Sequence, residues 1–416
     1  MSEAARSWLS HARSILTLAL PVMVARAGVL ILIAVDTAMT GHAGADELAA
    51  YAIASVPMIP LMLLGIGLMS GTTIFAARAM ANGDTREAGR IWRVACSIAL
   101  QSGTIMALIC LPGAWWLELL GQARDLAAAG AGPLFYLSLG LPAVLGFAAT
   151  SFFLESLGRP LPGVAIILAA NILNAFLNWL LIYGQWGFAA SGADGAAIAT
   201  TVVRWLSLIA LCVYIYWRLP QQRFGLTGIN PQAGKLRRRI WRFGIPMGLA
   251  HMLESAAFAT MTIFAGWMGT IPLAAFQSAF NLLSLPFMLA LGFSTAASVR
   301  VASALARKRT ADALRAGVTA TALCASALAA LAISYALFTP FYAGLYSNEE
   351  PVLALLLPAI IAAAWVLCPD GMQGTLIGAL RGCGDVWPAT GLYIMCFWAS
   401  WCRPDTGWES TRAMVQ

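Results

Sequence analysis

The feature that most constrains this chain is a series of long apolar runs, each long enough to cross a lipid bilayer. A membrane-spanning helix needs roughly 20 mostly apolar residues. Because an unpaired backbone group in hydrocarbon is costly, each run has to be helical. We therefore predict an all-α polytopic membrane protein of about eleven spans, at residues 14–38, 51–74, 94–117, 133–154, 163–183, 193–217, 243–268, 272–297, 316–341, 353–376 and 386–401.

Composition supports a chain whose solvent is largely lipid. Of its 416 residues 60% are hydrophobic and 10% charged, whereas a soluble domain carries about 25% charged residues. The net charge of +7 is dispersed and has no aromatic residues interleaved with it, which argues against a nucleic-acid partner. The eight cysteines form no CxxC pair and are expected to pack. The long first run has no cleavage site after it, so we expect no cleaved signal peptide.

The basic residues predict the orientation. If the N-terminus is cytoplasmic and the runs alternate sides, twenty Lys and Arg fall on the inside and only Arg124 falls outside. Such an excess on the cytoplasmic side is typical of membrane proteins. We therefore expect a multi-pass protein whose N-terminus is in the cytoplasm.

The chain also repeats itself at an offset of 225 residues, as shown by Pro21 and Pro246, Gly67 and Gly292, or Tyr51 and Phe276. Six spans separate the copies, so both have the same orientation and a substrate cavity is expected between them. The predicted organisation is an N-lobe at 1–217, a basic cytoplasmic linker at 218–242, a C-lobe at 243–401 and an atypical polar tail at 402–416.

Four carboxylates stand in or beside the apolar runs: Asp36, Glu155, Glu254 and Asp370. An acid at bilayer depth is costly and is retained mainly where it has a function. Asp36 could alternatively reach the headgroups, and Glu155 could form a helix-end pair with Arg159, four residues on. Glu254 and Asp370 lie deeper, with no intramembrane Lys or Arg close in sequence.

Three amides share one face of the fifth run. Asn171, Asn174 and Asn178 are spaced i, i+3, i+7. They could hydrogen-bond between helices, or provide neutral oxygen ligands for Na⁺ opposite a carboxylate. At the repeat offset Asp36 aligns with Met261 and Glu254 with Val29, so the acids of the two halves are not equivalent.

The order of the motifs along this chain, from about residue 14 to 397, resembles the multidrug and toxic compound extrusion family, in particular its NorM-like branch. The resemblance rests on Leu20-Pro21, Val35-Asp36-Thr37 and Gly41, on Asn174 and Asn178 ahead of Tyr183-Gly184, on Glu254, and on Asp370 with Gln373, Gly378, Leu380-Arg381-Gly382 and Gly384-Asp385.

The resemblance implies twelve helices in two lobes of six, and efflux of hydrophobic, often cationic compounds driven by inward Na⁺ or H⁺. Carried over, it implies an N-lobe cation or proton site at Asp36, Asn174, Asn178 and Thr200, and a C-lobe site at Glu254 and Asp370. Gln277 and Asn281 would line the substrate cavity. Na⁺ would bind at the same coupling residues. No resident cofactor, a monomer and the bacterial inner membrane are expected.

The end of the sequence departs from the family. A twelfth run is missing and the tail from Cys402 is polar, as a frameshift or premature stop would produce. A non-functional truncated transporter is therefore one alternative. Another is a lipid-linked saccharide flippase of the same superfamily, although intramembrane acids outnumber Arg26 and Arg204. An enzyme is disfavoured because the chain has three histidines and neither HExxH nor GxSxG.

Overall fold

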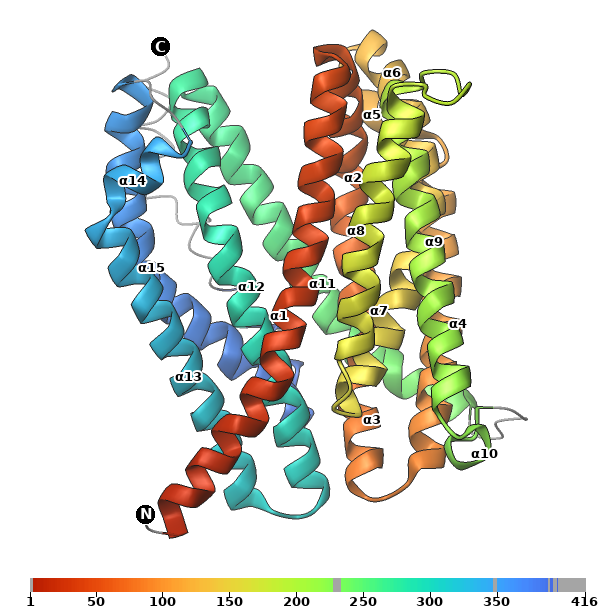
Figure 1. Cartoon of the computed structure of the whole chain (residues 1–416), viewed down its shortest axis with the longest axis vertical. Helices are drawn as coiled ribbons and strands as arrows, with labels where there is room; N and C mark the ends of the chain where they lie inside the picture. The colour runs from red at the N-terminus through yellow and green to blue at the C-terminus, as the bar shows by residue number, and fades with distance from the viewer. Residues whose placement is uncertain (1–2, 227–232, 347–349, 388–389, 392–394, 396–416) are drawn as a thin grey trace.

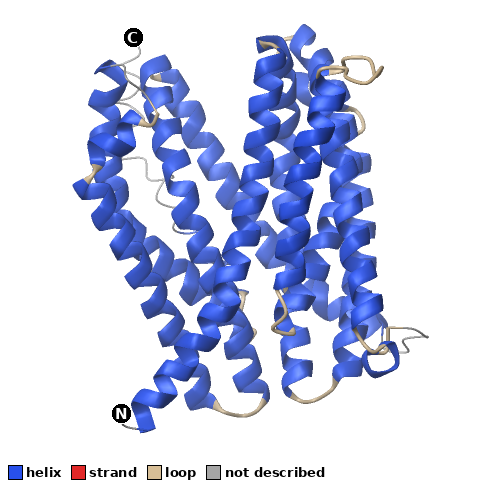
Figure 2. Cartoon of the chain, in the orientation of Figure 1, coloured by secondary structure: helices blue, strands red, loops and turns tan. Residues whose placement is uncertain are grey.

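The computed structural model describes residues 3–226, 233–346, 350–387, 390–391 and 395, and every element within them is helical (Figure 2). In chain order the helices are α1 (Glu3–Ala43), α2 (Ala45–Met69), α3 (Gly71–Ala81), α4 (Thr85–Cys110), α5 (Gly113–Leu119), α6 (Arg124–Leu139), α7 (Leu141–Ser156), α8 (Leu161–Ile182), α9 (Gly192–Arg218), α10 (Gln221–Phe224), α11 (Ala233–Trp267), α12 (Thr270–Ala306), α13 (Thr310–Leu337), α14 (Thr339–Gly344) and α15 (Glu350–Cys383).

The predicted all-α polytopic fold is confirmed. Ten of the eleven predicted runs coincide with these helices, and nine stretches of the described chain are long and apolar enough to cross a membrane. The run at 386–401 lies mostly outside the described residues, and the tail at 402–416 lies wholly outside them.

Several predicted runs consist of two helices rather than one. The first break, at Ser70, separates α2 from α3, and there the Ser70 hydroxyl donates to the carbonyl of Gly67 at 2.6 Å. The second, at Gly140, separates α6 from α7, whose first turn contains Pro142. Proline is tolerated in the first turn of a helix because the N–H that it lacks would have no intrahelical acceptor there. Hydropathy cannot report such breaks, because the residues around them stay apolar.

The helices form two groups that lie close at one end and diverge toward the other (Figure 1). One group contains α2 to α9, and the other contains α12, α13 and α15. The ends that lie close carry the N-terminus, the α3–α4 turn at 82–84, α10 and the α12–α13 turn at 307–309. We call this the basic end, since Arg86, Arg223 and Arg307 lie there.

Helices α1 and α11 cross between the two groups. The first part of α1 packs on α12 and α13 before the helix joins α8, and α11 begins against α2 and α4 before it joins α12 (Figure 1). Two glycines allow the close approach. A Cβ at Gly67 would lie 2.6 Å from the Cα of Gly248, and one at Gly292 would lie 2.3 Å from Met23. These two contacts are equivalent at the 225-residue offset.

The predicted linker at 218–242 is partly helical. Helix α11 already begins at Ala233, and its apolar positions Leu236, Ile240 and Phe243 are all buried. Their i, i+4, i+7 spacing describes one helical face. The guanidinium of Arg239 stacks over the ring of Phe75 at 4.3 Å. Most basic residues of this segment therefore lie on a helix that packs against the N-terminal half.

Candidate functional site

The carboxylate of Asp36 lies inside the N-terminal half and is the centre of a hydrogen-bond network. Asp36 is on α1 and only 1% exposed. Its Oδ1 accepts a hydrogen bond from Asn178 Nδ2 at 2.7 Å. Its Oδ2 accepts from the hydroxyls of Thr200 at 2.6 Å and Tyr51 at 2.9 Å. The alternative in which Asp36 reaches the headgroups does not fit this burial.

Asn174 forms a second layer behind these donors. Its Nδ2 donates to the hydroxyl of Thr200 at 3.3 Å, and its Oδ1 accepts from Asn178 Nδ2 at 3.3 Å. Asn174 and Asn178 are one turn apart on α8, and both are fully buried. Buried polar groups are stable only when hydrogen-bonded. The network therefore holds α1, α2, α8 and α9 in one arrangement.

The structure brings together the four residues predicted for the N-lobe, Asp36, Asn174, Asn178 and Thr200. Sequence reasoning missed Tyr51. A signal for it existed, because the repeat places Phe276 at the equivalent position. The first half has the hydroxyl of Tyr51 and the acid Asp36, and the second half has neither at the equivalent positions. Two polar groups that are confined to the same half are expected to interact with each other.

One intramembrane arginine lies near this network. Arg204 follows Thr200 by one turn of α9 and interacts electrostatically with Asp36 and Tyr51. Its Nη1 donates to the carbonyl of Leu137 at 3.5 Å. Arg204 therefore contributes a positive field at the carboxylate without a direct ion pair.

The third amide of α8 has a different role. Asn171 Nδ2 donates to the carbonyls of Gly28 at 3.0 Å and Ile167 at 2.8 Å. At the other end of the contact, the hydroxyl of Tyr183 donates to the carbonyl of Met39 at 2.9 Å. Asn171 and Tyr183 thus fasten α8 to α1 on both sides of Asp36.

The predicted pairing of Glu155 with Arg159 is wrong. Glu155 is 5% exposed, and its Oε1 lies 3.8 Å from Nη2 of Arg26 on α1. Arg26 also stacks over the ring of Phe152 at 5.2 Å. Arg159 is exposed, because α7 ends at Ser156 and the chain turns away through Gly158. Helical i, i+4 spacing does not apply across a helix end.

The two acids predicted for the C-lobe site lie on helices with different main partners. Glu254 is half-buried on α11, which packs chiefly on α2. Asp370 is exposed on α15, which packs on α12 and α13. Their joint site stays a prediction.

The predicted cavity residues Gln277 and Asn281 are both exposed on α12. They flank Phe280, whose ring stacks on Phe276 with centroids 6.2 Å apart and contacts Phe258 at 5.1 Å. Apolar aromatic surface next to two amides can bind a flat hydrophobic compound. Their contact with a substrate stays a prediction.

No three His, Cys, Asp or Glu side chains cluster as metal ligands within the residues that the structure describes. Around Asp36 the remaining oxygens are neutral: the hydroxyls of Thr200 and Tyr51 and the amide oxygens of Asn174 and Asn178. Asn178 Oδ1 is buried and has no hydrogen-bond partner in the described part of the chain. This amide must present its NH₂ to the carboxylate, so its oxygen is left free for another ligand.

The fold and the site define a polytopic α-helical membrane protein of two repeated halves with a buried carboxylate in the first. The MatE family model matches residues 21–180 and 246–400, and the two matches begin 225 residues apart, the offset of the internal repeat. The chain belongs to the MatE family.

Curated relatives match over most of the chain. The "Probable multidrug resistance protein NorM" of Caulobacter vibrioides is 31% identical, over 92% of this chain and 82% of the relative. The protein of that name from Bradyrhizobium diazoefficiens is also 31% identical, over 93% and 85%. The "Multidrug resistance protein NorM" of Vibrio vulnificus is 29% identical, over 93% and 85%.

Solved structures share the fold at lower identity. The eukaryotic MATE transporter AtDTX14 superposes with a TM-score of 0.85 at 19% identity, covering 94% of this chain and 87% of that one. The outward-facing conformation of a multidrug resistance MATE family transporter gives a TM-score of 0.83 at 19% identity, covering 96% and 89%.

Proposed function

We propose that this chain is a cation-coupled antiporter that exports hydrophobic, often cationic compounds by alternating access, driven by Na⁺ or H⁺. Its setting would be the bacterial inner membrane, with the basic end in the cytoplasm. Relatives named for multidrug resistance support the export, and none of those cited is named for a chemical reaction. The observation that carries the coupling is a buried Asp36 held by donors from three other helices.

Asp36 can couple a cation to helix packing because its oxygens are already occupied. An ionised carboxylate needs donors when it is buried. A proton on Oδ2 would compete with the hydroxyls of Thr200 and Tyr51, and one on Oδ1 would compete with Asn178. Either displacement loosens a contact between α1 and a neighbouring helix. A ligand shifts a conformational equilibrium by its differential affinity for the two states, and this exchange of donors provides one.

Na⁺ could use the same group in a different way. Hard cations prefer oxygen ligands, and Asp36, Thr200, Asn174 and the free Oδ1 of Asn178 provide them within one buried cluster. Either cation would cancel the charge of Asp36. A cationic compound held partly by that charge would then be released, which couples cation entry to export.

Glu254 and Asp370 are proposed as a second coupling site in the C-terminal half. Glu254 is half-buried and Asp370 is exposed in the present arrangement. We expect Glu254→Gln and Asp370→Asn each to abolish drug resistance while the protein still inserts into the membrane. Wild-type resistance in cells carrying either variant would remove that residue from the mechanism.

Reconstituted transport tests the coupling proposal directly. Ethidium efflux from proteoliposomes would be followed under an imposed Na⁺ gradient or an imposed pH gradient, applied separately. We expect one of them to drive efflux in the wild type. Asp36→Asn should lower the driven rate by at least about tenfold, since hydrogen bonds to a charged group contribute about 1.5–3 kcal/mol.

Asp125→Asn is the matched control for that substitution. It removes an exposed carboxylate of the same half at the end of the molecule away from the basic end, and it should leave the driven rate unchanged. A wild type that responds to neither gradient would reject the antiporter proposal. A driven rate in Asp36→Asn equal to that of Asp125→Asn would reject Asp36 as the coupling group.

A further inference from the structure

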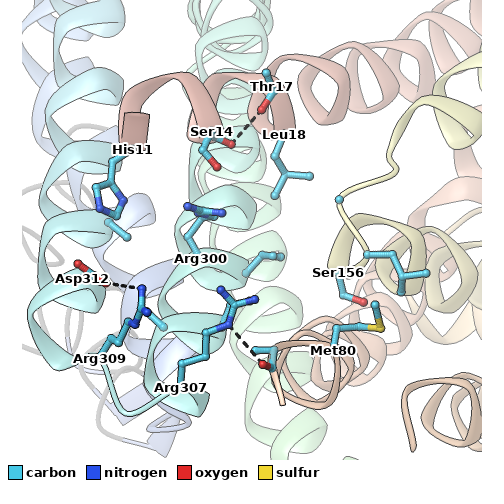
Figure 3. Close-up of a pocket in the computed structure, with 17 residues that line it drawn as sticks. His11, Ser14, Thr17, Leu18, Met80, Ser156, Arg300, Arg307, Arg309 and Asp312 are labelled. Carbon is cyan, nitrogen blue, oxygen red and sulfur yellow. Dashed lines mark hydrogen bonds and ion pairs between the residues drawn. The ribbon is translucent and has the colours of Figure 1, made fainter. Parts of the chain in front are cut away.

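A cavity of about 700 Å³ lies at the basic end, away from Asp36 (Figure 3). Helices of both groups line it: α3 and the end of α7 on one side, α12 and α13 on the other, with the start of α1 alongside. Three arginines, Arg300, Arg307 and Arg309, contribute to its wall. The proposed coupling mechanism uses none of these residues.

The positive charge of this cavity is only partly compensated. Asp312 lies 3.7 Å from Arg309 and 3.9 Å from Arg315, so it is shared by two arginines. Nε of Arg307 donates to the uncharged carbonyl of Ala81 at 3.3 Å. Arg300 interacts electrostatically with Arg307 and Asp312, but no hydrogen bond or ion pair of its own is found among the described residues. Two guanidinium groups are therefore left without a carboxylate of their own.

Neutral polar groups share the cavity wall with those two arginines. Ser14 and Thr17 on α1, Ser156 at the end of α7 and Ser303 on α12 line the same cavity (Figure 3). His11 Nδ1 is buried and lacks a hydrogen-bond partner in the described part of the chain. Guanidinium forks and hydroxyls are the donors that phosphate oxygens accept from, and a wall of this kind fits a phosphate group.

The depth of the cavity indicates the source of that phosphate. Helix α12 ends at Ala306 and α13 begins at Thr310, and Arg307 and Arg309 of the turn between them line the cavity. The cavity thus lies where the spans leave the hydrocarbon, at the level of lipid headgroups. Basic pockets between spanning helices at this level bind anionic headgroups.

We propose that this cavity binds the phosphate of an anionic phospholipid headgroup through Arg300 and Arg307. Since the wall comes from both halves, a bound headgroup bridges α1 and α7 with α12 and α13. Occupancy would then favour the arrangement in which the halves lie close at the basic end.

Thermal unfolding of the full chain in neutral detergent tests this. Phosphatidylglycerol should raise the melting temperature of the wild type by several degrees, since a ligand that binds the folded state stabilises it, and phosphatidylcholine should not. Arg300→Gln should lose at least half of that shift. This variant should fold, because Arg300 has no hydrogen bond or ion pair to lose in the described residues. Arg223→Gln, which removes an exposed arginine at the same end, should keep the whole shift.

Inorganic phosphate forms the other arm. If phosphate alone gives an Arg300-dependent shift as large as that of phosphatidylglycerol, the site takes a free phosphate and the lipid source is wrong. Equal shifts in Arg300→Gln and Arg223→Gln would overturn the site itself. Should Arg300→Gln not fold, native mass spectrometry of the wild type decides, because the proposal requires that phosphatidylglycerol be retained in preference to phosphatidylcholine.

Discussion

Asp36 carries unequal sets of hydrogen bonds on its two carboxylate oxygens. Oδ2 accepts two hydroxyls, from Thr200 and Tyr51, whereas Oδ1 accepts one amide. Thr200 also accepts from Asn174, so its hydroxyl connects the two layers of the network. Loss of Thr200 therefore breaks two hydrogen bonds, and loss of the Tyr51 hydroxyl breaks one.

That difference predicts an order of effect for two near-isosteric substitutions. Tyr51→Phe removes one donor and creates the residue found at position 276 of the repeat, and we expect gradient-driven efflux to fall about threefold to tenfold. Thr200→Val should reduce it further, because it also leaves an amide of Asn174 unpaired. Initial rates of ethidium efflux at equal protein density give the comparison. A larger loss in Tyr51→Phe would contradict the two-layer description.

At the scale of elements, the crossing of α1 and α11 depends on glycines that face another helix. A Cβ at Gly67 would meet the backbone of Gly248, which has no flexible atoms to move aside. Gly374 on α15 is also a helical glycine, yet a Cβ there would meet nothing within 4 Å. Both glycines are helical, Gly67 in the last turn of α2 and Gly374 inside α15, but only Gly67 faces a neighbouring backbone.

We therefore predict that Gly67→Ala lowers the free energy of unfolding by about 1–3 kcal/mol, the usual cost of overpacking. Gly374→Ala should be neutral or slightly stabilising, because alanine favours the helix. Melting temperatures of both variants in the same detergent provide the measurement. If Gly67→Ala were as stable as Gly374→Ala, the two helices would not be in close contact at this point.

Elements are also the scale at which sequence reasoning succeeds or fails for physical reasons. Ten of the runs located by hydropathy coincide with described helices, because burial in lipid demands apolar residues along a whole helix. Hydropathy could not find the breaks at Ser70 and Gly140, where local hydrogen bonds decide. Nor could it place α11 from Ala233 against the N-terminal half, since the Lys and Arg between the buried positions Leu236 and Ile240 give this stretch the composition of a solvated linker. Asp36, Asn174, Asn178 and Thr200 were predictable as a set by resemblance alone, whereas Tyr51 had only the difference from Phe276 in the repeat as a signal, and the fold shows its contact with Asp36.

On the scale of the whole molecule, the two halves are held together near the basic end. Nη2 of Arg78 on α3 donates to the carbonyl of Gly382 on α15 at 2.9 Å, and Arg307 reaches Ala81. Away from this end the groups diverge (Figure 1). Under the proposed alternating access, these contacts would break during each transport cycle.

A chemical cross-link at this contact should stop transport. Cys383 follows Gly382 and is exposed, so Arg78→Cys places a second thiol across the boundary between the halves. We expect a short bifunctional thiol reagent to abolish gradient-driven ethidium efflux in this variant. Adding Cys383→Ser to Arg78→Cys should remove the sensitivity to the reagent. Cross-linked protein that transports at the untreated rate would show that the halves need not separate here.

The exchange of α1 and α11 between the halves has a consequence for how such a protein could arise. In a polypeptide consisting of one half, the first helix would extend beyond its own bundle. The bundle would also have an open groove for the first helix of another copy. Two identical copies would satisfy both needs by swapping that helix, as domain-swapped dimers do. Joining the copies in one chain turns the swap into an internal contact, and each copy is then free to change alone. Phe276 and Met261 occupy the positions equivalent to Tyr51 and Asp36 of the first copy. A hydroxyl–acid pair that is present in one half and absent from the other is possible only when the two halves are fused and no longer identical.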